Sequence, residues 1–319
     1  MTKFTLLRLD FIAMVEVLKL MNPISLFNLS QISQKSIKYA QLANTKNFKL
    51  SIFEDRITVN QSYHFEIAKS LNLNFLAPWG FRKFQNVKVE AAHRDPAVLT
   101  CVWKDGPAGI LKTMLHLIEV FGCTVESYEY CRRDTTDHGI LTAIMEKQGG
   151  IRRLSVLLKA GMDTEWINEN VKGVEEMICE DYCRADVAMC ANLKYLYCMY
   201  IDLNHMLALK SCEAIIYSLA FFNLNYVDSV MKAWKSGDLP NLQYFSVRSA
   251  HFIGGEVLGF TAEQLSNKDY VVDKWKMVQG RFVSIYHGVE IQRDDGARAV
   301  MGLHTTMRGT LRQFIFYSL

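Results

Sequence analysis

The chain has 319 residues, of which half are hydrophobic and 22% are charged. This balance is typical of packed globular domains and excludes global disorder. The net charge of +3 gives no strong field for nucleic acid or an anionic membrane, and the longest apolar run, residues 214–222, is too short to span a membrane. Arg8 and Asp10 interrupt what would be the apolar part of a signal peptide. We therefore expect a cytoplasmic or nuclear protein that is not secreted and that binds neither nucleic acid nor membranes.

The first 48 residues predict three short helices. Asp10 is a suitable cap for the first helix, and Pro23 suits the first position of the second. The first helix has an apolar face with three- and four-residue spacing, formed by Phe11, Met14, Val15, Leu18 and Met21. A third helix follows through Ile32 and Ile37. Because so small a bundle makes a poor core of its own, we expect it to need a partner surface.

Strands are predicted after residue 48. Phe48, Leu50 and Ile52 alternate with polar residues, and a polar turn at 54–56 leads to a second strand with Ile57. Further alternation predicts strands at 87–89 and 99–103, with a turn at 93–96 between them. From Gly106 onward, segments with a helical pattern alternate with segments that have a strand pattern. The helices carry apolar faces at 110–121 and 227–234, with Gly122 and Gly237 at their ends and Asn225 as the expected cap of the second.

The strands share a repeated triple. An apolar residue is followed by two free positions, a second apolar residue, one free position and a third apolar residue, with first members at 125, 151, 174, 193, 212 and 242. The steps of 19 to 30 residues are similar to the period of leucine-rich repeats, in which each strand buries its apolar set against the next repeat. The sequence therefore predicts an α+β protein, with a helical bundle followed by an irregular leucine-rich-repeat-like α/β stack that ends in a β-hairpin. A general α/β domain is the alternative, because the steps are irregular.

The eight cysteines are interpreted as reduced, buried thiols. A chain of this length needs no disulfides to build a core, and no Cys-x-x-Cys pair occurs. We considered zinc for the group at positions 179, 183, 190 and 198, but tight ligand pairs are missing. No phosphate loop, dinucleotide fingerprint or nucleophile elbow occurs either. His64 and Glu66 match only half of a zinc deaminase signature. We expect no metal, no cofactor and no catalytic residues.

Two segments resemble a known family. Leu7-Arg8-Leu9-Asp10-Phe11, with Asp10 at the place of the usual proline, Asn22-Pro23-Ile24, Leu26–Ser30 and Ile32–Ser36 resemble an F-box. The segment 222–247, with Trp234-Lys235-Ser236-Gly237, and the segment Gly288–Gly296 look like the F-box associated domain of the second type, which is paired with an F-box in a large nematode family. Asp295-Gly296 also predicts a hairpin turn independently. We therefore divide the chain into an F-box at 1–48 and an associated, repeat-like domain at 49–319, best matched at 150–305.

The resemblance implies a function without catalysis. F-box proteins bind the Skp adaptor, join a cullin-based ubiquitin ligase through it, and capture a protein substrate with the remaining domain. The adaptor would contact apolar residues of the first segment, namely Leu7, Leu9, Phe11, Val15, Leu18, Pro23, Ile24, Leu26, Leu29 and Ile32. The alternative is an interaction scaffold unconnected with ubiquitylation, in which the bundle is only the terminal cap of the stack. A cap would keep Leu18, Leu26 and Leu29 buried, whereas an F-box would offer some of them to its partner.

The candidate substrate contacts are three tyrosines. Side chains alternate across a strand, so an inward-pointing Leu196 leaves Tyr197 outward, with Tyr195 near it. In the last repeat, Tyr244 and Ser246 hold the places equivalent to Tyr195 and Tyr197. Tyrosine is enriched where binding energy concentrates, so we expect Tyr195, Tyr197 and Tyr244 to contact the unknown protein substrate. The alternative is that these tyrosines only cover the sheet.

Overall fold

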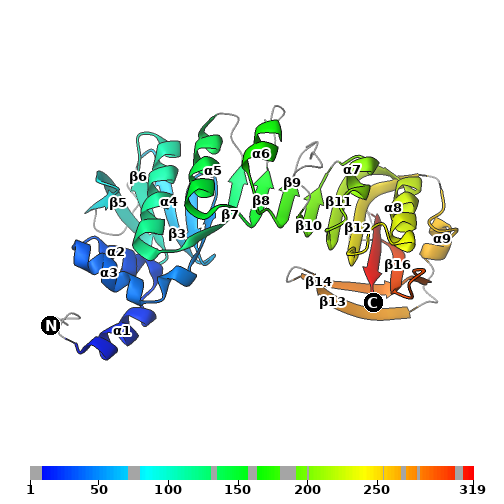
Figure 1. Ribbon diagram of the computed structural model, residues 1–319, viewed down its shortest axis with the longest axis horizontal. Helices are drawn as coiled ribbons and strands as arrows, with labels where there is room; N and C mark the ends of the chain where they lie inside the picture. Colours follow the sequence, from blue (N-terminus) through cyan, green and yellow to red (C-terminus); the bar gives the residue numbers. More distant parts are fainter. Residues whose placement is uncertain are drawn as a thin grey trace. The chain divides into compact units, whose positions relative to one another are not determined.

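The chain is a mixed α+β protein that divides into two compact units, residues 1–151 and 152–319 (Figure 1). The computed structural model describes residues 9–70, 80–130, 135–156, 164–179, 192–199, 201–253, 255–266, 271–278, 281–305 and 312–319. The three N-terminal helices share the first unit with everything up to residue 151, so the expected boundary at 48/49 does not separate the units. Within the described ranges, no helix is long and apolar enough to cross a membrane.

The helices of the first unit begin at the caps that the sequence supplies. Asp10 and Asn22 accept backbone N–H bonds at the starts of α1 and α2, and Asp105 does so for α4. Gly122 ends α4 in the left-handed conformation, as predicted. The helical segments are α1 (Phe11–Leu20), α2 (Pro23–Ser30), α3 (Gln34–Leu42), the 3-10 turn η2 (Thr45–Asn47), α4 (Gly106–Phe121) and α5 (Thr135–Gln148).

The sheet of the first unit has the strand order β7-β1-β2-β3-β6-β5-β4. Its strands are β1 (Lys49–Ile52), β2 (Arg56–Val59), β3 (Tyr63–Ala68), β4 (Gly80–Phe84), β5 (Val87–Asp95), β6 (Val98–Val102) and β7 (Thr124–Tyr130). The expected hairpin of β1 and β2 is confirmed, with Leu50 opposite Val59. β5 continues to Asp95, so the turn expected at 93–96 lies instead at Pro96 and Ala97.

Helix α2 is part of the core of the first unit. Phe27 is fully buried, and its ring contacts Phe65, Phe84 and His116 at centroid distances of 5.1, 5.3 and 5.9 Å. These partners come from β3, β4 and α4. The bundle is indeed too small to bury itself, and the rest of its own unit provides the missing surface.

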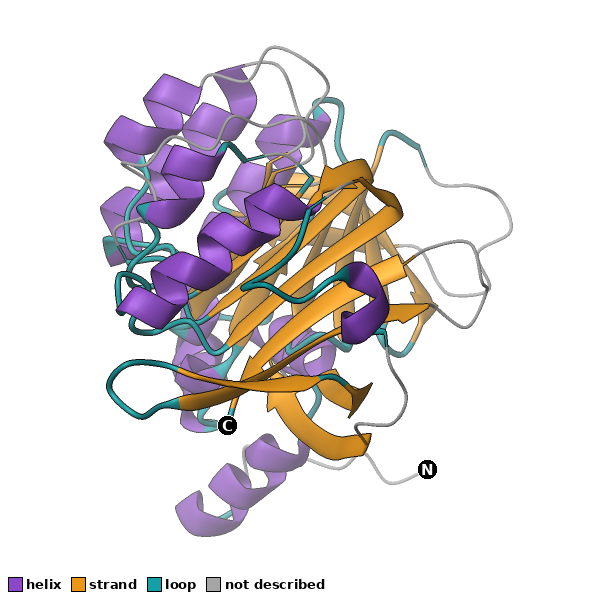
Figure 2. Ribbon diagram, turned by 90° about the vertical axis from the view of Figure 1, so that its right-hand side faces the viewer, coloured by secondary structure: helices purple, strands orange, loops and turns teal. Residues whose placement is uncertain are grey.

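The second unit has the strand order β15-β16-β17-β12-β11-β10-β9-β8. Its strands are β8 (Arg153–Val156), β9 (Glu176–Cys179), β10 (Tyr195–Cys198), β11 (Ala214–Asn223), β12 (Tyr244–Ile253), β15 (Val289–Gln292), β16 (Arg298–Thr305) and β17 (Arg312–Ser318). A separate pair is formed by β13 (Val271–Val278) and β14 (Arg281–His287). The helices are α6 (Thr164–Asn170), α7 (Leu203–Leu207), α8 (Leu224–Ser236) and α9 (Ala262–Leu265). Figure 2 shows α8 lying along the strands of this unit.

The predicted triples from 151 to 242 are confirmed as buried positions of β8 to β12 and their approaches. These strands are parallel and aligned, so the middle members form one buried row, Leu154, Met177, Leu196, Ile215 and Phe245. The third members form a second row, Val156, Cys179, Cys198, Tyr217 and Val247. Each step also repeats one hydrogen-bonding arrangement, in which two successive N–H groups donate to one carbonyl, that of Arg152, Glu175, Lys194 or Glu213.

The two C-terminal segments, residues 222–247 and Gly288–Gly296, contact each other through Arg293. Arg293 stacks on the Trp234 ring at 5.4 Å, donates to the carbonyl of Pro240 at 3.3 Å and pairs with Asp295 at 2.6 Å. The hairpin of β15 and β16 is confirmed, with Val289 opposite Met301. The start of α8 differs from the prediction: Asn223, not Asn225, is its cap, because the Asn223 side chain accepts the N–H of Asn225. Gly237 ends α8 as predicted.

Candidate functional site

The first candidate surface is the face of β8 to β11 opposite the buried rows, which we call the open strand face. Because side chains alternate along each strand, the residues between the buried members of each triple share this face. The parallel register aligns them in a row of partly exposed residues, Ser155, Ile178, Tyr197 and Ile216. This row offers two isoleucines, a tyrosine and a small hydroxyl, with no charged side chain.

A ladder of ion-paired side chains lies beside this row at the starts of the strands. Glu176 is buried, and its carboxylate contacts Arg152 at 3.3 Å and Arg153 at 2.5 Å. Glu175 contacts Arg152 at 3.5 Å and Lys194 at 3.2 Å. Both arginines remain solvent-exposed while they are paired with these carboxylates. Each charged side chain of the ladder has an oppositely charged partner within the ladder.

Tyr195 and Tyr197 both reach the open strand face. Tyr195 donates its hydroxyl to Glu213 at 3.3 Å, and burial together with that carboxylate raises the pKa of Tyr195. The phenol therefore remains a neutral donor. Tyr197 lies between Ile178 and Ile216 in register, and both tyrosines are partly exposed. The structure thus leaves two of the three predicted tyrosines partly exposed on this face.

The third predicted tyrosine, Tyr244, requires a correction: it is in register with Tyr195 through Ala214, but it is buried. It is 4% exposed and sits in a buried cluster with Ala214, Val300 and Ile315. The reason is that β17 pairs antiparallel with β12, placing Tyr317 opposite Tyr244, and β16 adds Val300 beyond it. Tyr244 is a core residue of this sheet and is not available to a substrate.

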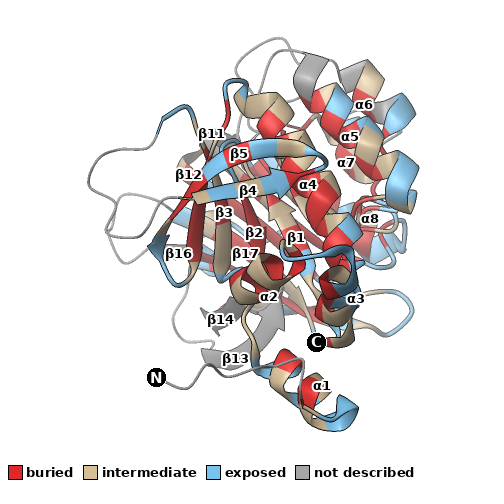
Figure 3. Ribbon diagram, turned by 90° about the vertical axis from the view of Figure 1, so that its left-hand side faces the viewer, coloured by how far each residue is buried: buried red, intermediate tan, exposed pale blue. Residues whose placement is uncertain are grey.

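The second candidate surface is formed by apolar side chains on the N-terminal helices. Phe11, Ile12 and Leu20 of α1 are 63%, 75% and 87% exposed, and Ile32, just after α2, is 73% exposed. Figure 3 shows the exposed and partly exposed stretches of α1. Ile12 and Leu20 were not among the expected contacts, because they lie off the apolar face predicted for the helix. The sequence does contain a signal for these two residues, because α1 carries more apolar residues than one face of a helix can hold.

The other expected adaptor contacts are distributed between interior and surface. Leu18, Pro23, Ile24 and Leu26 are buried within the chain, which contradicts their expected role as contacts. They are buried because α1 packs on α3, and α2 packs on α3 and α4. The partly exposed set is Leu9, Val15 and Leu29. Leu7 lies outside the described residues.

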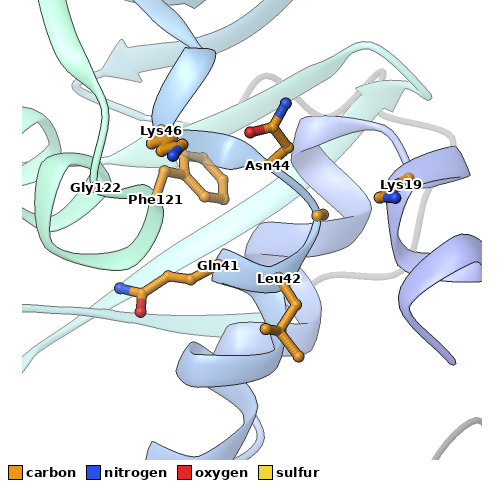
Figure 4. A pocket seen from close by; sticks show the side chains of 8 residues that line it. Lys19, Gln41, Leu42, Asn44, Lys46, Phe121 and Gly122 are labelled. Atoms are coloured by element: carbon orange, nitrogen blue, oxygen red, sulfur yellow. The ribbon is translucent and has the colours of Figure 1, made fainter. Parts of the chain in front are cut away.

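An open cavity of about 1010 Å³ lies at the C-terminal ends of α1, α3 and α4 (Figure 4). Its lining contains two lysines and two carboxamides but no carboxylate: Lys19, Gln41, Leu42, Ala43, Asn44, Lys46, Phe121 and Gly122. Lys19 is paired with Glu16 at 2.8 Å. A second cavity, of about 610 Å³, lies between the start of α3, the β4–β5 turn and α4, and is lined mainly by serine, glutamine and asparagine side chains.

The cysteines and the histidine that could serve as a nucleophile or a metal ligand have buried positions or contacts within the fold. Burial raises the pKa of Cys101 and of Cys123 to about 12, so neither is a ready nucleophile. His64 contacts the Thr58 hydroxyl at 3.2 Å on the neighbouring strand. Within the described part of the chain, no group of three metal-ligating side chains comes together. Cys131, Cys183 and Cys190 lie outside it.

Comparison of the chain with known protein families, with curated proteins and with solved structures gives no match.

Proposed function

We propose that the protein is the substrate-recognition subunit of a Skp-cullin-F-box ubiquitin ligase and has no catalytic activity of its own. In this proposal, residues 1–48 act as an F-box that binds a Skp-type adaptor and, through it, a cullin. The parallel strands of the second unit act as a leucine-rich-repeat-like stack that holds a protein substrate. The protein then works in the cytoplasm or nucleus.

The observation that carries the proposal is the exposed apolar surface of α1. Phe11, Ile12 and Leu20 are each more than half exposed on a single ten-residue helix. Burying a large apolar side chain contributes about 1.5–3 kcal/mol, so leaving three of them in water favours a partner that covers them.

The test is a binding measurement with purified full-length protein and a Skp-type adaptor. Phe11→Asp and Leu20→Asp should weaken binding at least tenfold, because each places a charge in an apolar interface. Phe81→Asp is the matched control, since Phe81 is 55% exposed on β4 in the same unit, and it should bind normally. Leu26→Asp is a poor test, because Leu26 is fully buried and the variant would lose its fold. Unchanged binding by both α1 variants would contradict the proposal.

The open strand face is the proposed substrate surface. Its central row is uncharged, and the charged side chains of the ladder beside it are paired with one another. We therefore expect substrate capture to depend on apolar and aromatic contacts and to change little with ionic strength. The double variant Tyr195→Ala, Tyr197→Ala should reduce capture of a co-purifying protein and leave adaptor binding intact. Tyr63→Ala, at a partly exposed tyrosine of β3, is the control. Equal capture by both variants would place the binding surface elsewhere.

A scaffold unconnected with ubiquitylation is the second candidate function. It is favoured by the burial of Leu18 and Leu26, which a terminal cap requires and an F-box interface does not. The two candidates differ in one measurement, since a scaffold would capture its partner through the strand face but would not bind the adaptor at all.

A further inference from the structure

Helix α2 is attached to the sheet of its unit by two carboxamide–histidine pairs. Asn28 places its amide nitrogen 3.3 Å from Nε2 of His93 on β5. Gln31, directly after the helix, places its amide nitrogen 3.2 Å from Nε2 of His116 on α4. Both carboxamides are partly buried. The two pairs are separated by three residues, which brings them to one side of the helix.

The other end of each carboxamide decides which way it points. The Asn28 oxygen accepts from Nε of Arg82 at 2.8 Å, and the Gln31 oxygen accepts from the backbone N–H of Lys83 at 2.7 Å. A guanidinium and a peptide N–H can only donate, so both amide oxygens are committed to β4. Both NH₂ groups therefore donate to the histidines, and both Nε2 atoms must accept.

An accepting Nε2 has a lone pair, which requires each imidazole to be neutral with its proton on Nδ1. Adding a proton at Nε2 would turn each hydrogen bond into two donors facing each other. We propose that Asn28 and Gln31 clamp α2 onto β4, β5 and α4 only while His93 and His116 are neutral, so that acidification loosens α2. This device stands on the contacts of the first unit and is independent of the proposed function.

The charges around the histidines largely support the neutral forms. His93 is faced by Arg82 from β4, which acts with burial to lower its pKa, while Arg94 and Asp95 lie next to it on its own strand and Arg94 is directed to Glu66 of β3 at 3.6 Å. Burial also lowers the pKa of His116, against Glu119 on α4, which raises it. Lys83 of β4 lines the cavity beside His116, whereas α2 and α3 contribute only uncharged groups there. The aromatic rings of Phe27 and Phe84 complete its surroundings.

The sign of the pH dependence follows from these directions. A histidine whose pKa is lower in the folded state binds its proton more readily when the clamp is open. The clamp is therefore strongest at a pH above 6.5, the ordinary pKa of histidine, and weakens as the pH falls below that value. Because both histidines shift in the same direction, acidification should increase the exchange of the α2 amides more than either pair would alone.

The experiment measures hydrogen exchange of the α2 amides in the full-length protein at about pH 7.5 and about pH 5.5, corrected for intrinsic exchange rates. Wild-type α2 should exchange faster at the lower pH. Gln31→Glu retains an acceptor for the Lys83 N–H but presents a carboxylate to His116, which favours the protonated ring, so the acid effect should shrink or reverse. Gln61→Glu adds the same charge at an exposed position of the turn between β2 and β3, outside the cavity that His116 lines, and should follow the wild type.

Two results would overturn the proposal. One is equal protection of wild-type α2 at both pH values, or the same acid effect in Gln31→Glu as in Gln61→Glu. The other comes from the wild-type protein alone: nitrogen NMR of the imidazoles at about pH 7.5 should find the Nδ1–H tautomer for His93 and His116, and an Nε2–H tautomer at either would refute the clamp.

Discussion

Replacing Phe27 by alanine tests whether the N-terminal helices are part of the folded core. Phe27 is fully buried, and its ring contacts three other aromatic rings from β3, β4 and α4. A buried Phe→Ala change costs about 3–5 kcal/mol, and aromatic pairs add about 0.5–1.5 kcal/mol each beyond area burial. We therefore expect a cost near the upper end, about 4–5 kcal/mol, to the stability of the first unit.

Native-state hydrogen exchange of β2 and β3 is the suitable assay, because the two units need not unfold together. These strands pair through Ile57 and Phe65, and Phe65 contacts the Phe27 ring directly. A loss of about 4 kcal/mol corresponds to roughly a thousand-fold faster exchange, at 1.4 kcal/mol per factor of ten. Amides of β11 and β12 in the second unit provide an internal reference.

Phe11→Ala is the matched control, with the same substitution on an exposed side chain of the same bundle. Phe11 is 63% exposed, so the change should stay within about 0.5 kcal/mol. If Phe27→Ala cost less than about 1 kcal/mol, or no more than Phe11→Ala, then α2 would not be packed on the sheet as the structure places it, and our account of the first unit would be refuted.

Two further predictions concern single positions. Gly109→Ala should destabilise the first unit by about 1–3 kcal/mol in thermal unfolding, because a Cβ there would lie 2.6 Å from the buried Trp103 ring. Gly139→Ala in α5, where a Cβ meets nothing within 4 Å, should instead stabilise by up to about 1 kcal/mol, and loss of stability at both sites would contradict this contrast. Arg293 and two backbone N–H groups lower the pKa of Asp295 to about 2. The stabilising effect of this carboxylate should therefore be complete at a pH above 3.8, its ordinary pKa, and should be lost as the pH falls toward about 2. An NMR titration of the Asp295 carboxyl checks this, and Arg293→Lys should bring its midpoint closer to 3.8.

Local sequence signals determined much of the secondary structure. Asp10, Asn22 and Gly122 act at helix ends as predicted, because a cap depends only on side-chain and backbone groups a few residues apart. The strand triples also predicted which residues of β8 to β12 are buried. Their success has a simple cause: aligned parallel strands repeat the same pattern of inward and outward positions, so one strand's pattern holds for its neighbours.

Only the tertiary structure decided what covers each surface. Tyr244 and Tyr195 hold equivalent places in the triples, yet Tyr244 is buried and Tyr195 is partly exposed, because β17 pairs with β12 and β16 lies beyond it. Likewise Leu26 and Leu20 are both leucines of short apolar helices, yet α2 packs against α3 and α4 while Leu20 stays in solvent. Periodicity states which side of an element is apolar. Which distant segment of the chain reaches that side depends on long-range packing that no local pattern contains, as for Tyr244 and Tyr317, which pair across 73 residues.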